Sequence, residues 1–103
     1  MDHQHDFYMA DEVFIKQVIL KRGTGVQQHS HVYDHTSMVA MGTIRVMIGD
    51  EVLGDFKAPC GILIRARIMH KMIALEDSIF YCIHNTHSIP EELLEQELTH
   101  VRT

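Results

Sequence analysis

The sequence predicts an all-β domain, a sandwich or barrel of short strands, and three observations support this prediction. The chain has 103 residues, which is the length of a single domain. Between residues 13 and 84, short runs rich in valine, isoleucine and threonine recur, and several of them alternate between apolar and polar positions. Glycine, proline and aspartate separate these runs at close spacing, as is typical of strands joined by turns.

The first half of the predicted domain contains three strands. Residues 1–11 are polar, and we expect them to form a lead-in to a single domain at 12–103. In residues 13–20, Val13, Ile15 and Gln17 would lie on one face and Phe14, Lys16 and Val18 on the other. This run is rich in β-branched side chains, which predicts a strand. Both faces of that strand are partly apolar, so we expect the core on one side and the second subunit of a homodimer on the other. The remaining expected elements are a turn at 23–25 and strands at 27–31 and 36–41.

The second half is predicted to contain further strands and one helix. Ile44, Val46 and Ile48 share one face of a predicted strand. Pro90, the acidic residues after it and leucines on one side predict a short C-terminal helix at 90–99, on the outside of the barrel. The other expected elements are strands at 43–48, 52–57, 62–64, 70–75 and 79–84, hairpin turns at 49–51 and 76–78, and a corner at 59–61.

Charge and composition exclude several classes of function. The formal net charge is −5 with histidine neutral, so the chain lacks the basic footprint of a protein that binds nucleic acid or an anionic membrane surface. Its apolar runs are too short to span a bilayer. Cys60 and Cys82 do not make a disulfide framework, which predicts reduced thiols. The polar N-terminus has no apolar signal segment, so we expect a cytoplasmic protein.

The composition is unusual for its nine histidines, three of which lie within seven positions. His29 and His31 are separated by one residue, so on an extended strand both imidazoles leave the same face. His35 can join them if the chain turns or bulges in between. His70 is the natural candidate for a fourth nitrogen from a distant strand. Three or four imidazoles that converge on one point predict one divalent transition metal per chain, such as Mn, Fe, Co, Ni, Cu or Zn.

This arrangement resembles the first sequence motif of the cupin superfamily. The motif reads here Gly23-x5-His29-x-His31-x3-His35-x6-Gly42, with His35 where the family most often has a glutamate. A looser match to the second motif begins at Gly54 and leads to His70. The resemblance implies a small single-domain cupin of the four-histidine subgroup. It also implies the RmlC-like fold, a double-stranded β-helix or jelly-roll barrel.

The resemblance implies a metal bound by His29, His31, His35 and His70. Four neutral imidazoles would leave the full charge of a divalent ion on the site, which favours Lewis-acid chemistry. We therefore expect an enzyme that acts on a small polar substrate with a carboxylate or carbonyl group, by oxygenase (including dioxygenase), isomerase or lyase chemistry. The alternative is a non-catalytic module that binds a metal or a small ligand.

Several other residues have open roles near the predicted centre. Asp34 is the rival of His35 as third ligand. His84 follows Cys82 at strand period, so we expect it to face the interior, either as an acid or base beside the metal or as a structural histidine. Further side chains that either orient an anionic substrate or are simply solvated are Tyr33, Arg45, Arg65 and Arg67. Apart from a second subunit, the expected partner is a small-molecule substrate or ligand.

Overall fold

The computed structural model of the chain describes residues 3–28 and 34–85, and all regular structure in these two ranges is β-strand. Within the same ranges no helix is long and apolar enough to cross a membrane. The described strands are β1 (His3–Ala10), β2 (Val13–Leu20), β3 (Gly25–Gln28), β4 (His35–Met41), β5 (Thr43–Ile48), β6 (Glu51–Lys57), β7 (Cys60–Ile64), β8 (His70–Ala74) and β9 (Ser78–Asn85).

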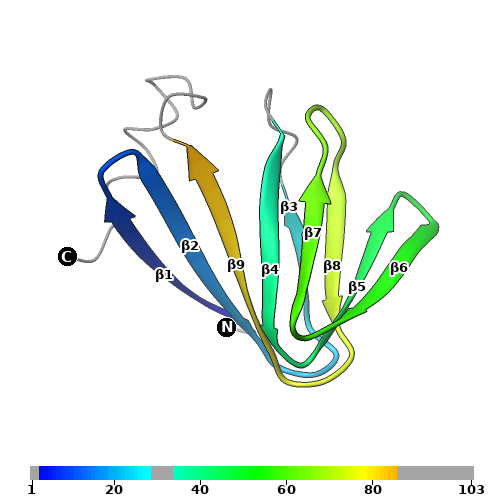
Figure 1. Cartoon of the computed structure of the whole chain (residues 1–103). Helices are drawn as coiled ribbons and strands as arrows, with labels where there is room; N and C mark the ends of the chain where they lie inside the picture. Colours follow the sequence, from blue (N-terminus) through cyan, green and yellow to red (C-terminus); the bar gives the residue numbers. More distant parts are fainter. Residues whose placement is uncertain (1–2, 29–33, 86–103) are drawn as a thin grey trace.

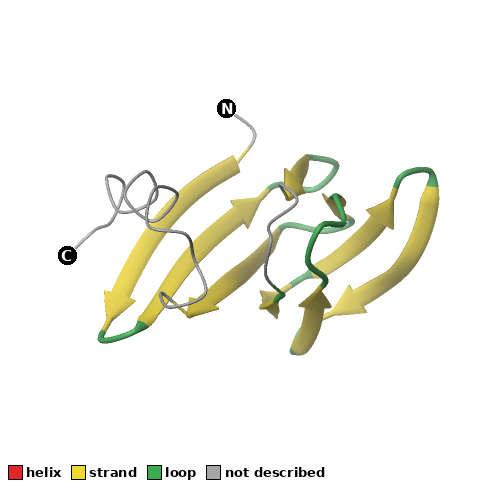
Figure 2. Ribbon diagram, turned by 90° about the horizontal axis from the view of Figure 1, so that it is seen from above, coloured by secondary structure: helices red, strands yellow, loops and turns green. Residues whose placement is uncertain are grey.

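The strands form two sheets that face each other (Figure 1). One sheet has five strands in the order β1-β2-β9-β4-β7, and the other has four in the order β3-β8-β5-β6. Every neighbouring pair is antiparallel. Seen from above in Figure 2, the described part of the chain consists of strands and the loops that connect them. The all-β prediction is therefore confirmed.

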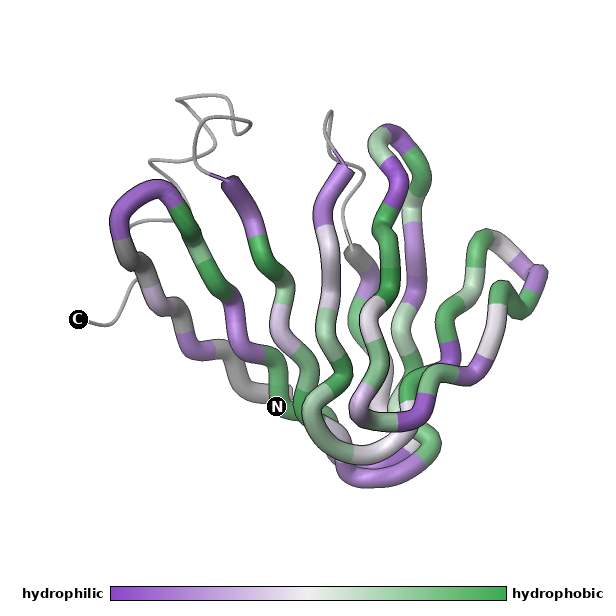
Figure 3. Tube along the Cα trace, viewed as in Figure 1, coloured by the Kyte–Doolittle hydropathy of each residue, from purple (hydrophilic) through white to green (hydrophobic). Residues whose placement is uncertain are grey.

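Alternation along each strand decides which side chains form the core. On β2, Phe14, Val18 and Leu20 are buried, and on β9 the buried side chains include Phe80 and Cys82. Since successive side chains on a strand point to opposite faces, these residues lie on the inner face of the five-stranded sheet. In Figure 3 the hydrophobic segments follow the strands, while hydrophilic residues gather at most of the turns. The core thus lies between the two sheets.

The predicted hairpin at 70–84 is wrong. β8 pairs with β3 and β5, whereas β9 pairs with β2 and β4, so the turn between β8 and β9 carries the chain from one sheet to the other. Ser78 fixes this crossing, because the Thr43 amide donates a hydrogen bond to its Oγ at 3.1 Å. Gly42, with φ of +82°, makes the matching crossing between β4 and β5. The two crossings lie against each other at one end of the barrel.

The N-terminal residues do not form the expected lead-in. Residues 3–10, which the sequence assigned to a polar lead-in, form β1 and pair with β2 along its whole length. The strand predicted at 27–31 begins earlier, at Gly25, and is described as far as Gln28. The predicted C-terminal helix at 90–99 lies outside the described residues. Strand boundaries elsewhere agree with the predictions to within a residue or two.

Candidate metal centre

Three of the candidate histidines lie at the same end of the two sheets, which we call the histidine end. His35 begins β4, opposite Ile64 at the end of β7. His70 begins β8, after the turn that follows β7. His84 is the last but one residue of β9, which is antiparallel to β4 and therefore finishes where β4 starts. In Figure 1 this is the upper end, where the arrowheads of β7 and β9 lie.

His70 is held in a defined orientation. Its side chain is 1% exposed, and its Nδ1 lies 2.9 Å from the Ile68 carbonyl oxygen. A carbonyl oxygen can only accept a hydrogen bond, so Nδ1 carries the proton and donates it. The lone pair of the neutral ring is then on Nε2. This is the arrangement in which a histidine is ready to bind a metal, because the second bond fixes both tautomer and ring orientation.

His35 and His84 form a buried pair on the inner face of the five-stranded sheet. Their ring centroids are 4.5 Å apart with the planes tilted by 33°. On its other side, His84 contacts Phe14, its register partner on β2, with centroids 5.8 Å apart. The prediction that His84 faces the interior is thus confirmed. The pairing of the strands brings His84 to the candidate ligand His35, although the two are 49 positions apart in the sequence.

The other two predicted ligands, His29 and His31, lie outside the described residues. The chain enters the segment 29–33 directly after Gln28, the register partner of His70, and leaves it next to His35. Within 3–28 and 34–85, no three histidine, cysteine, aspartate or glutamate side chains stand close enough together to hold a metal ion. A metal centre at the histidine end therefore depends on the segment between Gln28 and His35.

The carboxylate of Asp34, the alternative third ligand, makes its contacts with the turn after β7. Its Oδ1 accepts a hydrogen bond from the Ala66 amide at 2.6 Å, and its Oδ2 lies 3.7 Å from the Arg65 guanidinium. These contacts tie the start of β4 to the turn after β7. The side chain is exposed, whereas that of its neighbour His35 is buried. The structure therefore favours His35 over Asp34 as the residue that faces the interior.

The sequence analysis did not identify a second polar row on the same inner face. The buried Ser37 Oγ donates to the Cys82 Sγ at 3.6 Å, and Cys82 is in turn the register partner of Lys16 on β2. This row is one step further from the histidine end than the pair of His35 and His84. The signal in the sequence was Lys16 itself, which interrupts the row of apolar residues on its face of β2.

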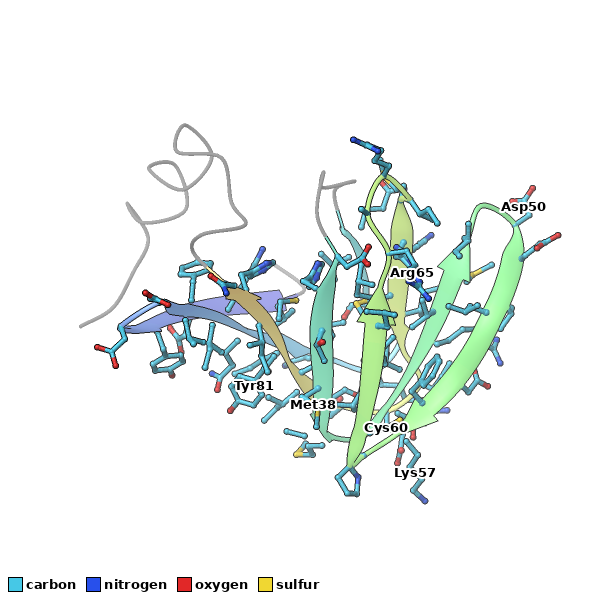
Figure 4. All side chains as sticks on the ribbon, turned by 45° about the horizontal axis from the view of Figure 1, so that its top comes forward. Met38, Asp50, Lys57, Cys60, Arg65 and Tyr81 are labelled. Carbon is cyan, nitrogen blue, oxygen red and sulfur yellow. The ribbon has the colours of Figure 1, made fainter. Side chains whose placement is uncertain are left out.

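Other candidate side chains lie away from this end or on the outer surface. Arg45 is on the outer face of the four-stranded sheet and pairs with Asp55, with Nε and Oδ1 2.8 Å apart. The hydrogen bond from Arg45 lowers the pKa of the Asp55 carboxyl, as expected for an exposed ion pair. Cys60 begins β7 and Arg65 follows its last residue, so the two lie at opposite ends of that strand (Figure 4). These residues are not part of the candidate centre, and Tyr33 lies outside the described residues.

Comparisons with known proteins give the fold. The structure is similar to that of KdgF from Halomonas sp., with a TM-score of 0.71 and 17% identity over 89% of this chain and 85% of that one. It is also similar to an RmlC-like cupin from Shewanella frigidimarina, with a TM-score of 0.70 and 13% identity over 89% of this chain and 81% of that one. The chain has the cupin fold.

A third similar structure is the cupin domain of an XRE family transcriptional regulator from Enterobacter cloacae, with a TM-score of 0.68 and 13% identity over 81% of this chain and 95% of that one. No family model matches the sequence, and no curated protein sequence matches it. At such low identities the cupin likeness is one of backbone arrangement, and cupin folds support many activities. The fold alone therefore does not assign a function to the site.

Proposed function

We propose that this cupin domain is a metal-dependent enzyme that acts on a small polar substrate with a carboxylate or carbonyl group. His29, His31, His35 and His70 would hold one divalent transition metal per chain. The reaction would be of oxygenase, isomerase or lyase type. A bound divalent ion would supply a Lewis acid that attracts the oxygen atoms of such a substrate.

The observation that carries this proposal is the orientation of His70. Its Nδ1 is committed to the Ile68 carbonyl oxygen, which leaves Nε2 as the nitrogen with a lone pair. Metal-binding histidines almost always donate their other ring N–H in this way, although the same bond also satisfies the N–H of a buried histidine that only fills a core. The four imidazoles are also a suitable donor set for Mn, Fe, Co, Ni, Cu or Zn. The chain runs into the segment 29–33 directly after Gln28, which is the register partner of His70.

The remaining residues of the inner face divide the interior into two parts. At the histidine end the inner face is polar, with His35 and His84 followed by Ser37 and Cys82. Further in, around Val39 and Phe80, it is apolar, as far as the buried Ser78 at the opposite end of β9. The apolar part excludes water from one side of the polar part. His84, in contact with His35, is the described residue best placed to give or take a proton beside the centre.

The alternative is a non-catalytic module that binds a metal or a small ligand. The similarity to the cupin domain of a transcriptional regulator favours this reading, because the same fold there belongs to a regulatory protein. The two readings differ at His84. An enzyme needs a proton donor or acceptor beside the metal, whereas a binding module does not.

The experiment that tests the proposal is a measurement of metal per chain. The untagged protein is purified without added metal or chelator and measured by inductively coupled plasma mass spectrometry, beside His70→Ala, His31→Ala and, as a control outside both motifs, His100→Ala. We expect close to one transition metal per chain in the wild type and the control, and loss of the metal in the other two. Absence of metal from the wild type after reconstitution with Mn, Fe, Ni, Cu and Zn would exclude the mechanism.

A further inference from the structure

Asp34 extends the contact between β4 and β7 beyond the point where the two strands pair. Their backbone pairing ends at His35 and Ile64. One step further, the Ala66 amide donates a hydrogen bond to Asp34 Oδ1 at 2.6 Å, which is short, as expected for a charged acceptor. Ala66 belongs to the turn 65–69, which carries the chain from β7 in one sheet to β8 in the other. Asp34 therefore ties this turn to the start of β4.

The same turn orients His70. The turn ends at His70, the first residue of β8, and the carbonyl oxygen of Ile68 accepts the hydrogen bond from His70 Nδ1 at 2.9 Å. Two groups of the turn are thus held by side chains, the Ala66 amide by Asp34 and the Ile68 carbonyl by His70. A shift of the turn would move this carbonyl, and the direction of the His70 Nε2 lone pair would change with it.

The backbone between these two groups has a conformation that its residues do not favour. Arg67 has a φ of +62°, in the left-handed region. An arginine rarely adopts this region, because its Cβ then comes too close to a backbone carbonyl oxygen. Such a conformation persists only where the surrounding contacts impose it. The path of the turn therefore depends on its contacts rather than on the preference of its own residues.

Of the two contacts of Asp34, the hydrogen bond is the one that can fix the backbone. Oδ2 of Asp34 lies 3.7 Å from Nη1 of Arg65, and the two side chains are 49% and 63% exposed. An ion pair so exposed contributes little, because water screens it and both side chains lose freedom to form it. A substitution that keeps the acceptor oxygen should therefore keep the role of Asp34, even when it removes the charge.

We propose that Asp34 is a positioning residue of the histidine end. Its hydrogen bond to the Ala66 amide sets the path of the turn 65–69 and, through the Ile68 carbonyl, the orientation of the His70 ring. The consequence for metal affinity rests on the proposed function. The orientation of His70, in contrast, is a property of the metal-free protein. This assignment gives Asp34 a role other than that of a ligand.

Nuclear magnetic resonance of the metal-free protein tests the first step. In the wild type we expect His70 to occupy only the tautomer with a proton on Nδ1, and the Ala66 amide to exchange slowly with water. In Asp34→Ala we expect both tautomers of His70 and fast exchange of the Ala66 amide. Asp34→Asn keeps an acceptor oxygen and should behave as the wild type. Arg65→Met, which removes only the ion pair, should also behave as the wild type.

Binding of Zn²⁺ alone, measured by isothermal titration calorimetry, tests the second step. We expect Asp34→Ala to bind Zn²⁺ about 10-fold more weakly than the wild type, as is typical when a residue that orients a metal-binding histidine is removed. Asp34→Asn should retain most of the affinity. Asp55→Ala is the matched control, because it removes an exposed carboxylate that also contacts an arginine, on the outer face of the other sheet. Thermal unfolding shows that each variant is folded.

The outcomes separate this inference from the proposed function. An unchanged His70 tautomer in Asp34→Ala would overturn the assignment, and so would a freely exchanging Ala66 amide in the wild type. Equal losses of Zn²⁺ affinity in Asp34→Asn and Asp34→Ala would also overturn it, since the charge rather than the hydrogen bond would then matter. If the wild type binds no Zn²⁺ or other transition metal, the proposed function fails, while the spectra of the metal-free protein still decide the role of Asp34.

Discussion

The imidazole rings of His35 and His84 lie against each other, with centroids 4.5 Å apart, on neighbouring strands of the five-stranded sheet. One of them is a predicted metal ligand and the other a predicted acid or base. Their contact means that any change to one ring alters the surroundings of the other. The first prediction separates their roles.

His84→Phe should leave the metal content unchanged, whereas His35→Ala should lower it strongly. Phenylalanine preserves the ring that packs between Phe14 and His35, so the fold and the position of His35 are kept. Metal per chain, measured by inductively coupled plasma mass spectrometry, checks both variants. Loss of the metal from His84→Phe would make His84 a ligand rather than a neighbour of one.

Removal of the proposed metal should destabilise the protein. A ligand that binds only the folded state at about 1,000 times its dissociation constant adds about 4 kcal/mol to the free energy of unfolding. For a domain of this size, that corresponds to a fall in melting temperature on the order of 20 °C when a chelator is added. Differential scanning fluorimetry with and without chelator measures the shift. The His70→Ala variant should show no chelator effect, and an equal shift in that variant would place the metal elsewhere.

Gly42→Ala should destabilise the barrel more than Gly49→Ala. Both glycines have a positive φ, which costs an alanine about 1 kcal/mol or more. A Cβ on Gly42 would in addition collide with Ser78, whereas a Cβ on Gly49 has no atom within 4 Å. We expect a loss of about 3 kcal/mol for Gly42→Ala and about 1 kcal/mol for Gly49→Ala. Urea unfolding measures both free energies of unfolding. Equal losses in the two variants would show that the backbone at the Gly42 crossing shifts to accommodate the added Cβ.

We expect the homodimer to form through the outer face of the five-stranded sheet. Apolar side chains lie exposed there on two neighbouring strands, with Met38 38% exposed on β4 and Leu63 47% exposed on β7. Such a face is usually polar when it meets water. Figure 4 shows Met38 beside its register partner Tyr81. Light scattering after size-exclusion chromatography should give twice the mass of one chain.

Met38→Lys should convert this dimer to a monomer, because it places a charge on the exposed apolar part of the face. Val52→Lys is the control, since Val52 is an equally apolar residue, 52% exposed, on β6 of the other sheet. A dimer that survives Met38→Lys but not Val52→Lys would place the interface on the four-stranded sheet.

The sequence predicted best the strands whose alternation is strong. The strand at 43–48 has the predicted bounds because its core-facing residues are regularly spaced and Gly42 and Gly49 flank it, and the strand at 13–20 was predicted from its β-branched side chains. β1 was missed because the first half of His3–Ala10 is polar and its apolar residues follow one another without alternation, although the whole segment pairs with β2. The hairpin at 70–84 was wrong because a short turn between two strands does not reveal whether the second strand stays in the same sheet.

The candidate site was predictable to the extent that spacing determines it. The motif around His35 and the lone His70 identified two histidines that the fold brings to one end of the barrel. The bond from His70 Nδ1 to Ile68 was not predictable, since it depends on the path of the turn before β8. The contact of Ser37 with Cys82 was not recognised because the two residues come from strands distant in the sequence.

The most direct test of the proposed metal centre is a crystal structure of the metal-loaded protein, with anomalous diffraction collected at the absorption edge of the bound metal. The account predicts one anomalous peak per chain at the histidine end, bound by His70 through Nε2 and by His29, His31 and His35. A peak bound by other residues, or a His70 whose Nε2 faces away from the metal, would contradict it.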